Sequence, residues 1–126
     1  MIAERLTAQL LAGAPARDAA AVAERLLAVQ AQDARGFRLA IRARTAGLTS
    51  AAVDRALTDG SLLVTWLNRG TLHLVRSEDY PWLHALTAPR MATGNGRRLV
   101  QEGVSADAAD RARRLSGPRR SRRWDP

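Results

Sequence analysis

The amino-acid sequence predicts a mostly α-helical domain that carries a two-stranded β-hairpin. Apolar residues recur at helical spacing from Ile2 to Leu57, and residue types that cap or end helices lie between the recurring runs. From Leu62 onward the pattern changes to two short runs rich in Leu, Val, Thr and Trp, which favour strands. An acidic helix start at Ser77 follows the second run.

Four helices are expected before the hairpin, and the second is the most consequential. Asp18 can cap this helix, whose apolar residues recur at i, i+4 and i+7, so we expect it to end between Gln30 and Asp33. Gly47 closes the third helix, and Thr49 caps the fourth. The expected ranges of the other three helices are residues 2–12, 37–44 and 50–58.

The two β-prone runs, residues 62–67 and 71–75, are separated by Asn68-Arg69-Gly70, a connection of usable length for a hairpin. Helices followed by a two-stranded hairpin are the order of elements in a winged helix, where the helix before the hairpin is the usual recognition element. The sequence therefore predicts a winged-helix domain of the helix-turn-helix type. An unrelated small α+β domain would give the same order of elements.

The predicted domain boundary lies at Val104. Residues 1–104 form the expected winged-helix domain, and Ser105 begins an Ala-rich helical stretch that reads as the start of a truncated second domain. From Arg113 onward Arg and Pro dominate, so no packed structure is expected and the tail of the segment 105–126 is predicted to be disordered. Two interpretations of this tail stay open: a basic arm that holds phosphates, or the truncated or frame-shifted end of a GC-rich gene.

Composition narrows the classes of function. With 126 residues and no cysteine, the chain can form one core but neither disulfides nor thiolate-ligated zinc, so a cytoplasmic protein is expected. No stretch reads as a signal peptide or a membrane span. The net charge is +8, but residues 1–110 hold 13 Arg against 11 acidic residues, and residues 111–126 hold 7 Arg against one Asp. Most of the positive charge therefore lies in the tail.

Metal and nucleotide sites are not predicted. His73 and His84 have no ligand spacing and no cysteine partner, so both are interpreted as structural histidines. Gly94-Asn95-Gly96 lacks the lysine and the preceding strand of a nucleotide site. We expect no cofactor.

Gln30 and Gln32 are the candidate catalytic residues. On a regular helix, side chains at i and i+2 point about 200° apart, so the two amides converge only where the helix ends or unwinds. Asp33 and Gly36 make such an end plausible. An amide cannot act as an ordinary general base, but it can orient a water molecule or a base edge. The alternative interpretation is two solvated polar residues at a helix end.

Three stretches resemble a known family: residues 27–33 (LAVQAQD), residues 65–75 (TWLNRGTLHLV) and residues 79–83 (DYPWL). Together they are similar to the start of the winged-helix DNA glycosylases, which include bacterial enzymes that excise N7-alkylated purines and unhook interstrand crosslinks. The likeness extends from about residue 6 to residue 104. Many members of this family are known only as winged-helix DNA-binding proteins.

The resemblance implies that Gln30 and Gln32 position a water against the anomeric carbon of a damaged nucleotide in double-stranded DNA. Arg69, Thr71 and His73 lie in the predicted hairpin, where contacts with DNA are expected, and a wing packed within the protein is the alternative. Family members contain several tandem winged helices. This chain resembles only their N-terminal part, so weak DNA binding and little or no turnover are expected.

Two other functions compete with DNA repair. A non-catalytic winged-helix module, such as a transcription regulator, needs a recognition helix that reads the major groove. The expected helix at residues 50–58 offers Arg55 beside Asp54, a poor groove reader. The other possibility is a truncated product without independent function, whose exposed apolar residues would promote self-association.

Overall fold

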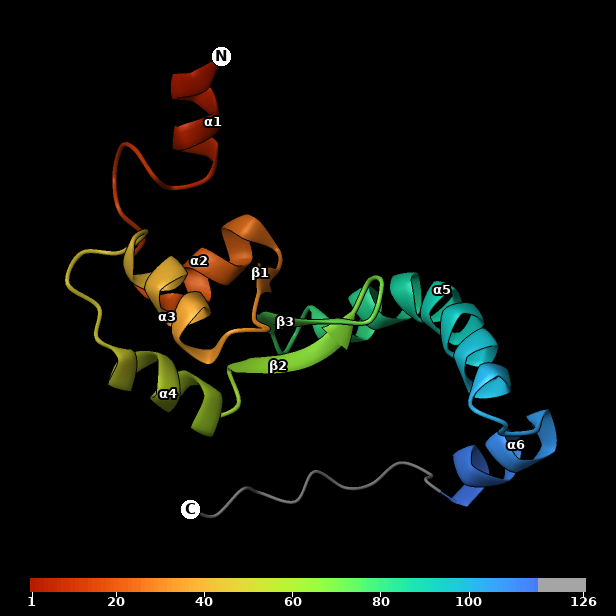
Figure 1. Ribbon diagram of the computed structural model, residues 1–126. Helices are drawn as coiled ribbons and strands as arrows, with labels where there is room; N and C mark the ends of the chain where they lie inside the picture. Colours follow the sequence, from red (N-terminus) through yellow and green to blue (C-terminus); the bar gives the residue numbers. More distant parts are fainter. Residues whose placement is uncertain (116–126) are drawn as a thin grey trace.

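The computed structural model describes residues 1–115, and this part of the chain holds six helices and three strands (Figure 1). The helix-rich architecture agrees with the prediction, but the sheet has three strands, not the two expected. The elements are α1 (Ile2–Ala8), α2 (Ala19–Leu26), β1 (Val29–Gln30), α3 (Ala34–Arg42), α4 (Ser50–Thr58), β2 (Leu62–Leu67), β3 (Thr71–Arg76), α5 (Tyr80–Gln101) and α6 (Ala106–Leu115).

The helix starts follow from local capping. The Asp18 carboxylate accepts a hydrogen bond from the Ala21 N–H (2.7 Å), and the Thr49 hydroxyl accepts one from the Ala52 N–H (3.3 Å). These contacts satisfy backbone donors that a helix leaves unpaired in its first turn. Both predicted caps, and the range predicted for α4, are confirmed.

Two predicted helices are shorter than expected. The first ends at Ala8, not at residue 12, because Leu10 adopts a φ of +56° and the Leu11 N–H donates back to the Leu6 carbonyl (2.8 Å). Such a closure satisfies the last carbonyls of a helix. The second ends at Leu26, well before Gln30, so the prediction of a helix through the glutamine pair is wrong.

The extra strand explains the correction to the second helix. Val29 and Gln30 form β1, which pairs antiparallel with β3 in a sheet of order β1-β3-β2. The backbone groups that a longer helix would have satisfied internally are instead paired with another strand, and the Val29 side chain is buried. The free energy gained from this pairing and burial exceeds the preference for a longer helix that the apolar repeat in the sequence indicates.

Both faces of the sheet are packed. One face lies against α2, α3 and α4, and its largest fully buried sheet residues are Leu62 and Leu74. The other face carries Leu67 and Val75, which pack against Leu83 of α5. The small sheet is therefore the layer between the α2–α4 cluster and the start of α5.

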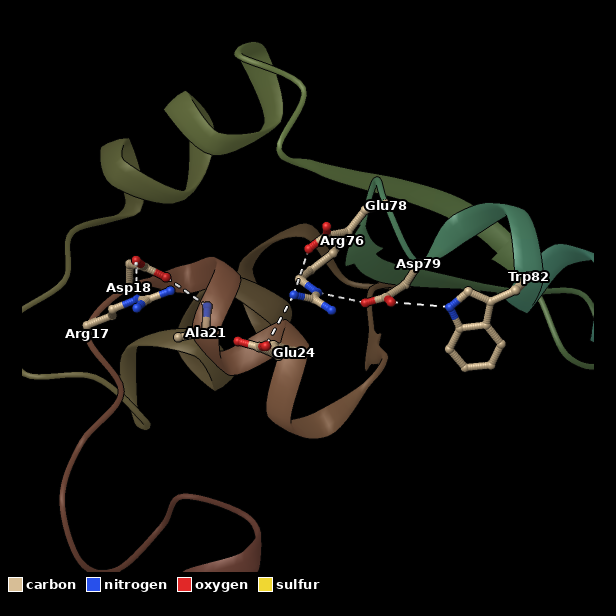
Figure 2. Close-up of polar contacts among 8 residues, drawn as sticks. All are labelled: Arg17, Asp18, Ala21, Glu24, Arg76, Glu78, Asp79 and Trp82. Carbon is tan, nitrogen blue, oxygen red and sulfur yellow. Dashed lines mark hydrogen bonds and ion pairs between the residues drawn. The ribbon is translucent and has the colours of Figure 1, made fainter.

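An arginine holds the end of β3 to its neighbours. The guanidinium of Arg76 donates to Asp79 (2.7 Å) and forms ion pairs with Glu78 (2.7 Å) and with Glu24 on α2 (3.3 Å), as Figure 2 shows. Asp79 also accepts from the indole N–H of Trp82 (3.2 Å). The hydrogen bond from Arg76 lowers the pKa of the Asp79 carboxyl below its usual 3.8. These contacts link α2, β3 and the first turn of α5.

Beyond the sheet, α5 leads away from the α2–α4 cluster and α6 lies at its far end (Figure 1). The helix predicted to begin at Ser105 is present as α6, and the Ser105 hydroxyl accepts from the Ala108 N–H (3.2 Å). This helix runs to Leu115, beyond Arg113, where no packed structure was expected. The rest of the predicted disordered tail, residues 116–126, lies outside the described residues. In residues 1–115 no helix is long and apolar enough to cross a membrane.

We predict that Leu74→Ala lowers the free energy of unfolding by about 2–5 kcal/mol, because a fully buried leucine leaves a cavity that the surroundings refill only in part. Urea unfolding followed by circular dichroism measures this loss. As a control, Leu86→Ala removes the same atoms at a position that is 69% exposed, and its effect should stay within about 0.5 kcal/mol. Equal losses in the two variants would contradict the assigned core.

The second prediction concerns acid unfolding. Because the folded-state pKa of Asp79 is lowered, its carboxylate contributes stability above the unfolded pKa of 3.8, and that stability is lost as the pH falls through the folded value. Asp79→Asn should therefore reduce the melting temperature at neutral pH and flatten its decline below about pH 4. Some decline should remain, since the Ser61 N–H lowers the pKa of Asp59 as well. An unchanged pH profile would refute the role given to Asp79.

Candidate functional site

The two candidate glutamines meet at the end of β1. The Nε2 atom of Gln30 donates a hydrogen bond to the Oε1 atom of Gln32 over 2.5 Å, and both side chains are exposed. Side chains two residues apart point to the same side of an extended chain, whereas on a helix they would diverge. Because α2 stops at Leu26, the amides lie side by side.

The residue between the glutamines fixes their orientation. Ala31 is buried, and its N–H donates to the Leu72 carbonyl of β3 (2.8 Å). Alternation along an extended chain then turns Gln30 and Gln32 away from the core. The Asp33 carboxylate ends the extended segment, because it accepts from the Arg35 N–H (2.9 Å) and starts α3.

Entry into β1 depends on a strained residue. Leu27 has a φ of +68° and a ψ of −47°, a conformation that residues with a side chain rarely adopt. This conformation ends α2 abruptly and redirects the chain toward β3. The glutamine pair is therefore positioned by a turn at Leu27 on one side and by the Asp33 cap on the other.

The amide pair retains most of its hydrogen-bonding capacity. An amide offers two N–H donors and an oxygen that can accept two hydrogen bonds. The contact between Gln30 and Gln32 uses one donor and one acceptor site, so further donors and oxygen lone pairs stay open to solvent. The pair can hold a water molecule or a base edge in a fixed orientation, without a change of charge.

His73 lies next to the pair across the sheet. It is the register partner of Gln30 on one side and of Thr65 on the other, so the three side chains form one row on the same sheet face. The Nδ1 atom of His73 is 2.9 Å from the carbonyl oxygen of Thr71. Because a carbonyl oxygen only accepts, this contact is a hydrogen bond when the proton is on Nδ1.

The other two residues predicted to bind DNA lie at the start of β3 and in the hairpin turn before it. Thr71 is half-buried at the start of β3, while Arg69 is exposed in the hairpin turn between Asn68 (φ +54°) and Gly70 (φ +81°). The structure thus brings His73 to the glutamine pair and leaves Arg69 at the hairpin tip. Thr65, which completes the row, was missed. The alternation of apolar and polar residues from Val29 to Gln32 could have indicated a strand there, but only the pairing of His73 with both neighbours places Thr65 in the row.

Metal and nucleotide binding find no geometric support in the described residues. Among residues 1–115, no three His, Asp or Glu side chains gather closely enough to hold a metal ion. The ring of His84 contacts that of Tyr80, with centroids 5.4 Å apart. Gly94 and Gly96 lie within α5, so their backbone N–H groups do not form a phosphate-binding loop.

The fold and the site define a small helical domain whose three-stranded antiparallel sheet exposes a hydrogen-bonded glutamine pair at its edge. The family model described as DNA glycosylase AlkZ-like matches residues 23–123, and the chain belongs to this family. A solved structure, the DNA glycosylase AlkZ of Streptomyces sahachiroi, is similar with 39% identity and a TM-score of 0.55. The similarity covers 59% of this chain and 20% of that protein, so this chain corresponds to about a fifth of AlkZ. A search of curated proteins found no match.

We predict that the usual order of alanine and glycine stability is reversed at Leu27. In a helix interior, glycine is about 1 kcal/mol less stable than alanine. At a positive φ the alanine side chain is strained by a similar amount, so Leu27→Gly should be about 1 kcal/mol more stable than Leu27→Ala. The comparison removes the leucine in both variants. For comparison within α2, the wild type, which has alanine at position 20, should be more stable than Ala20→Gly. If alanine is more stable than glycine at position 27 as well, the turn assigned to Leu27 is wrong.

Proposed function

We propose that this chain is a winged-helix DNA-binding part of a DNA-repair glycosylase that acts on alkylated bases in double-stranded DNA. Gln30 and Gln32 are the proposed catalytic residues. The observation that carries the proposal is the exposed hydrogen-bonded pair of amides. Membership of the AlkZ-like DNA glycosylase family supports the choice of DNA as the substrate.

The order of elements supports the winged-helix interpretation. The helices α3 and α4 are followed directly by the β2–β3 hairpin, and the short strand β1 adds a third strand to it. In this arrangement the hairpin is the wing. We propose that Arg69 at its tip contacts a phosphate, with Thr71 and His73 next to the backbone closer to the glutamines. A protein that repairs chromosomal DNA would act in the cytoplasm of a bacterium.

The proposed reaction is hydrolysis of the N-glycosidic bond. A water oriented by the amide oxygens forms a bond to the anomeric carbon as the bond to the purine nitrogen breaks. The bonding electrons leave with the purine, which carries a positive charge when alkylated at N7 and departs as a neutral base. The water loses one proton to solvent, and an abasic sugar remains. Because the leaving group is already activated, orientation of the water supplies the main catalytic effect.

Neutral amides are suited to this reaction. Positive charge is present on the alkylated base and develops on the sugar in the transition state. Amide oxygens stabilise such charge through their dipoles, and they need no change of protonation between substrate and product. The proposed site therefore keeps the same charge through the whole reaction.

The substitutions Gln30→Ala and Gln32→Ala test the proposal. We expect each to slow release of N7-methylguanine from a duplex by about 100-fold, and the double variant to lose little more, because the residues act as a unit. Release is measured under single-turnover conditions with protein in excess, by cleavage of the abasic product in alkali. Excess protein is needed because a chain corresponding to a fifth of AlkZ is expected to bind weakly.

The matched control is Gln101→Ala, which removes an exposed glutamine at the end of α5 and should leave the rate unchanged. Wild-type release no faster than spontaneous depurination would reject catalysis by this chain. Equal rates of base release for the wild type and both site variants would reject only the catalytic role of the glutamines.

A further inference from the structure

A second candidate site lies between α3 and α4. The two helices border an open groove of about 490 Å³. Three arginines from α3 line it, Arg35, Arg38 and Arg42, and α4 contributes Ser50 and Asp54. With three guanidiniums and one carboxylate, the groove carries a formal charge of +2. Its walls belong to two different helices, so no single stretch of the sequence indicates it.

The central arginine of the groove is already occupied. Arg38 binds the Asp54 carboxylate through its Nε atom (2.9 Å) and also through a terminal nitrogen. Its other terminal nitrogen donates to the Ala34 carbonyl (2.6 Å), and its guanidinium lies 4.6 Å from the centre of the Phe37 ring. Arg38 therefore fastens α3 to α4 and neutralises the one carboxylate that lines the groove.

The two flanking arginines remain available. Arg35 and Arg42 are exposed, and within residues 1–115 neither guanidinium makes a hydrogen bond or an ion pair. They are seven residues apart, so they lie on the same face of α3, with about 10 Å of helix axis between them. This separation lets each guanidinium reach a different anionic group, which suits a polyanion with regularly spaced phosphates better than one compact anion.

We propose that the α3–α4 groove binds the phosphodiester backbone of duplex DNA, with Arg35 and Arg42 each contacting one phosphate. The choice of DNA among polyanions rests on the proposed function. Contacts of this kind position a duplex without reading its sequence. Because α3 begins directly after the glutamine pair, and Arg35 is only three residues beyond Gln32, the groove would hold the backbone close to the reacting nucleotide.

The test is the affinity of the full chain for an undamaged duplex of about 20 base pairs, measured by fluorescence anisotropy over a range of salt concentrations. We expect Arg35→Gln with Arg42→Gln to weaken binding on the order of tenfold per arginine near 0.1 M salt. The slope of log affinity against log salt should fall by about 0.9 for each phosphate that the variant no longer neutralises. Both residues are exposed, so the variant should fold, which circular dichroism verifies.

The matched control is Arg90→Gln with Arg97→Gln, which removes the same net charge at two exposed positions of α5 that are also seven residues apart and do not line the groove. This control should keep most of the affinity and the salt slope. An equal loss of affinity in the control and groove variants would overturn the proposal, because net charge alone would then explain binding. Unchanged affinity in the groove variant would overturn it as well.

A gain-of-affinity variant provides a second, independent test. Asp54→Asn removes the carboxylate from the groove, raises its formal charge from +2 to +3, and leaves an amide oxygen that can still accept from Arg38. Duplex binding should become severalfold tighter, and unchanged or weaker binding would contradict the proposal.

Failure of this proposal can be told apart from failure of the glycosylase proposal. The duplex in the binding assay carries no lesion, so its binding does not depend on catalysis. Loss of base release in Gln30→Ala, together with normal duplex binding by the groove variant, would reject the groove alone. Normal base release in Gln30→Ala, together with weakened duplex binding by the groove variant, would support the groove and reject catalysis by the glutamines.

Discussion

The pairing of the two-residue strand β1 with β3 is the interaction on which the candidate site depends. It draws the chain out of α2, fixes Ala31 through the hydrogen bond to the Leu72 carbonyl, and turns the two glutamines to one side. The strand is too short to be stable alone, so it forms only on an existing partner. That partner is held in place by Arg76, whose ion pairs join the end of β3 to α2 and to the start of α5. The geometry of two surface amides thus depends on contacts among α2, β3 and the start of α5.

The features that sequence analysis predicted are those fixed by neighbouring residues. Capping by Asp18 and Thr49 depends on atoms three residues away, and the β2–β3 hairpin depends on a turn between adjacent strands. Strand β1 depends on a partner more than forty positions along the chain, and Val29 satisfies the helical repeat as well as it satisfies a strand. Only the assembled sheet decides between the two. The positive φ of Leu27 is equally unpredictable, because a leucine gives no local signal for it.

In the candidate site, too, the features fixed by neighbouring residues could be predicted and those fixed by distant residues could not. The residue types raised the possibility that Gln30 and Gln32 orient a water, and the family resemblance gave them that role. The condition that the helix must end before them follows from helical geometry. The way in which this condition is met, through a turn, a buried alanine and a capped helix, required coordinates. The groove between α3 and α4 was harder to predict, because Arg38 and Asp54 are sixteen positions apart and their ion pair decides which arginines stay free.

The proposed mechanism gives a physical reason for the separation of neutral and charged groups along residues 30–42. A guanidinium beside the anomeric carbon would repel both the alkylated base and the positive charge that develops on the sugar, which would raise the barrier. Amide oxygens at that point stabilise the same charge. Affinity for a polyanion nevertheless requires cations within reach of its backbone. Placing Gln30 and Gln32 on an extended segment, and Arg35 and Arg42 on the helix that follows, meets both requirements with one short stretch of chain. The exposed Asp33 carboxylate lies between the two groups, and its cap begins the helix whose arginines line the groove with α4.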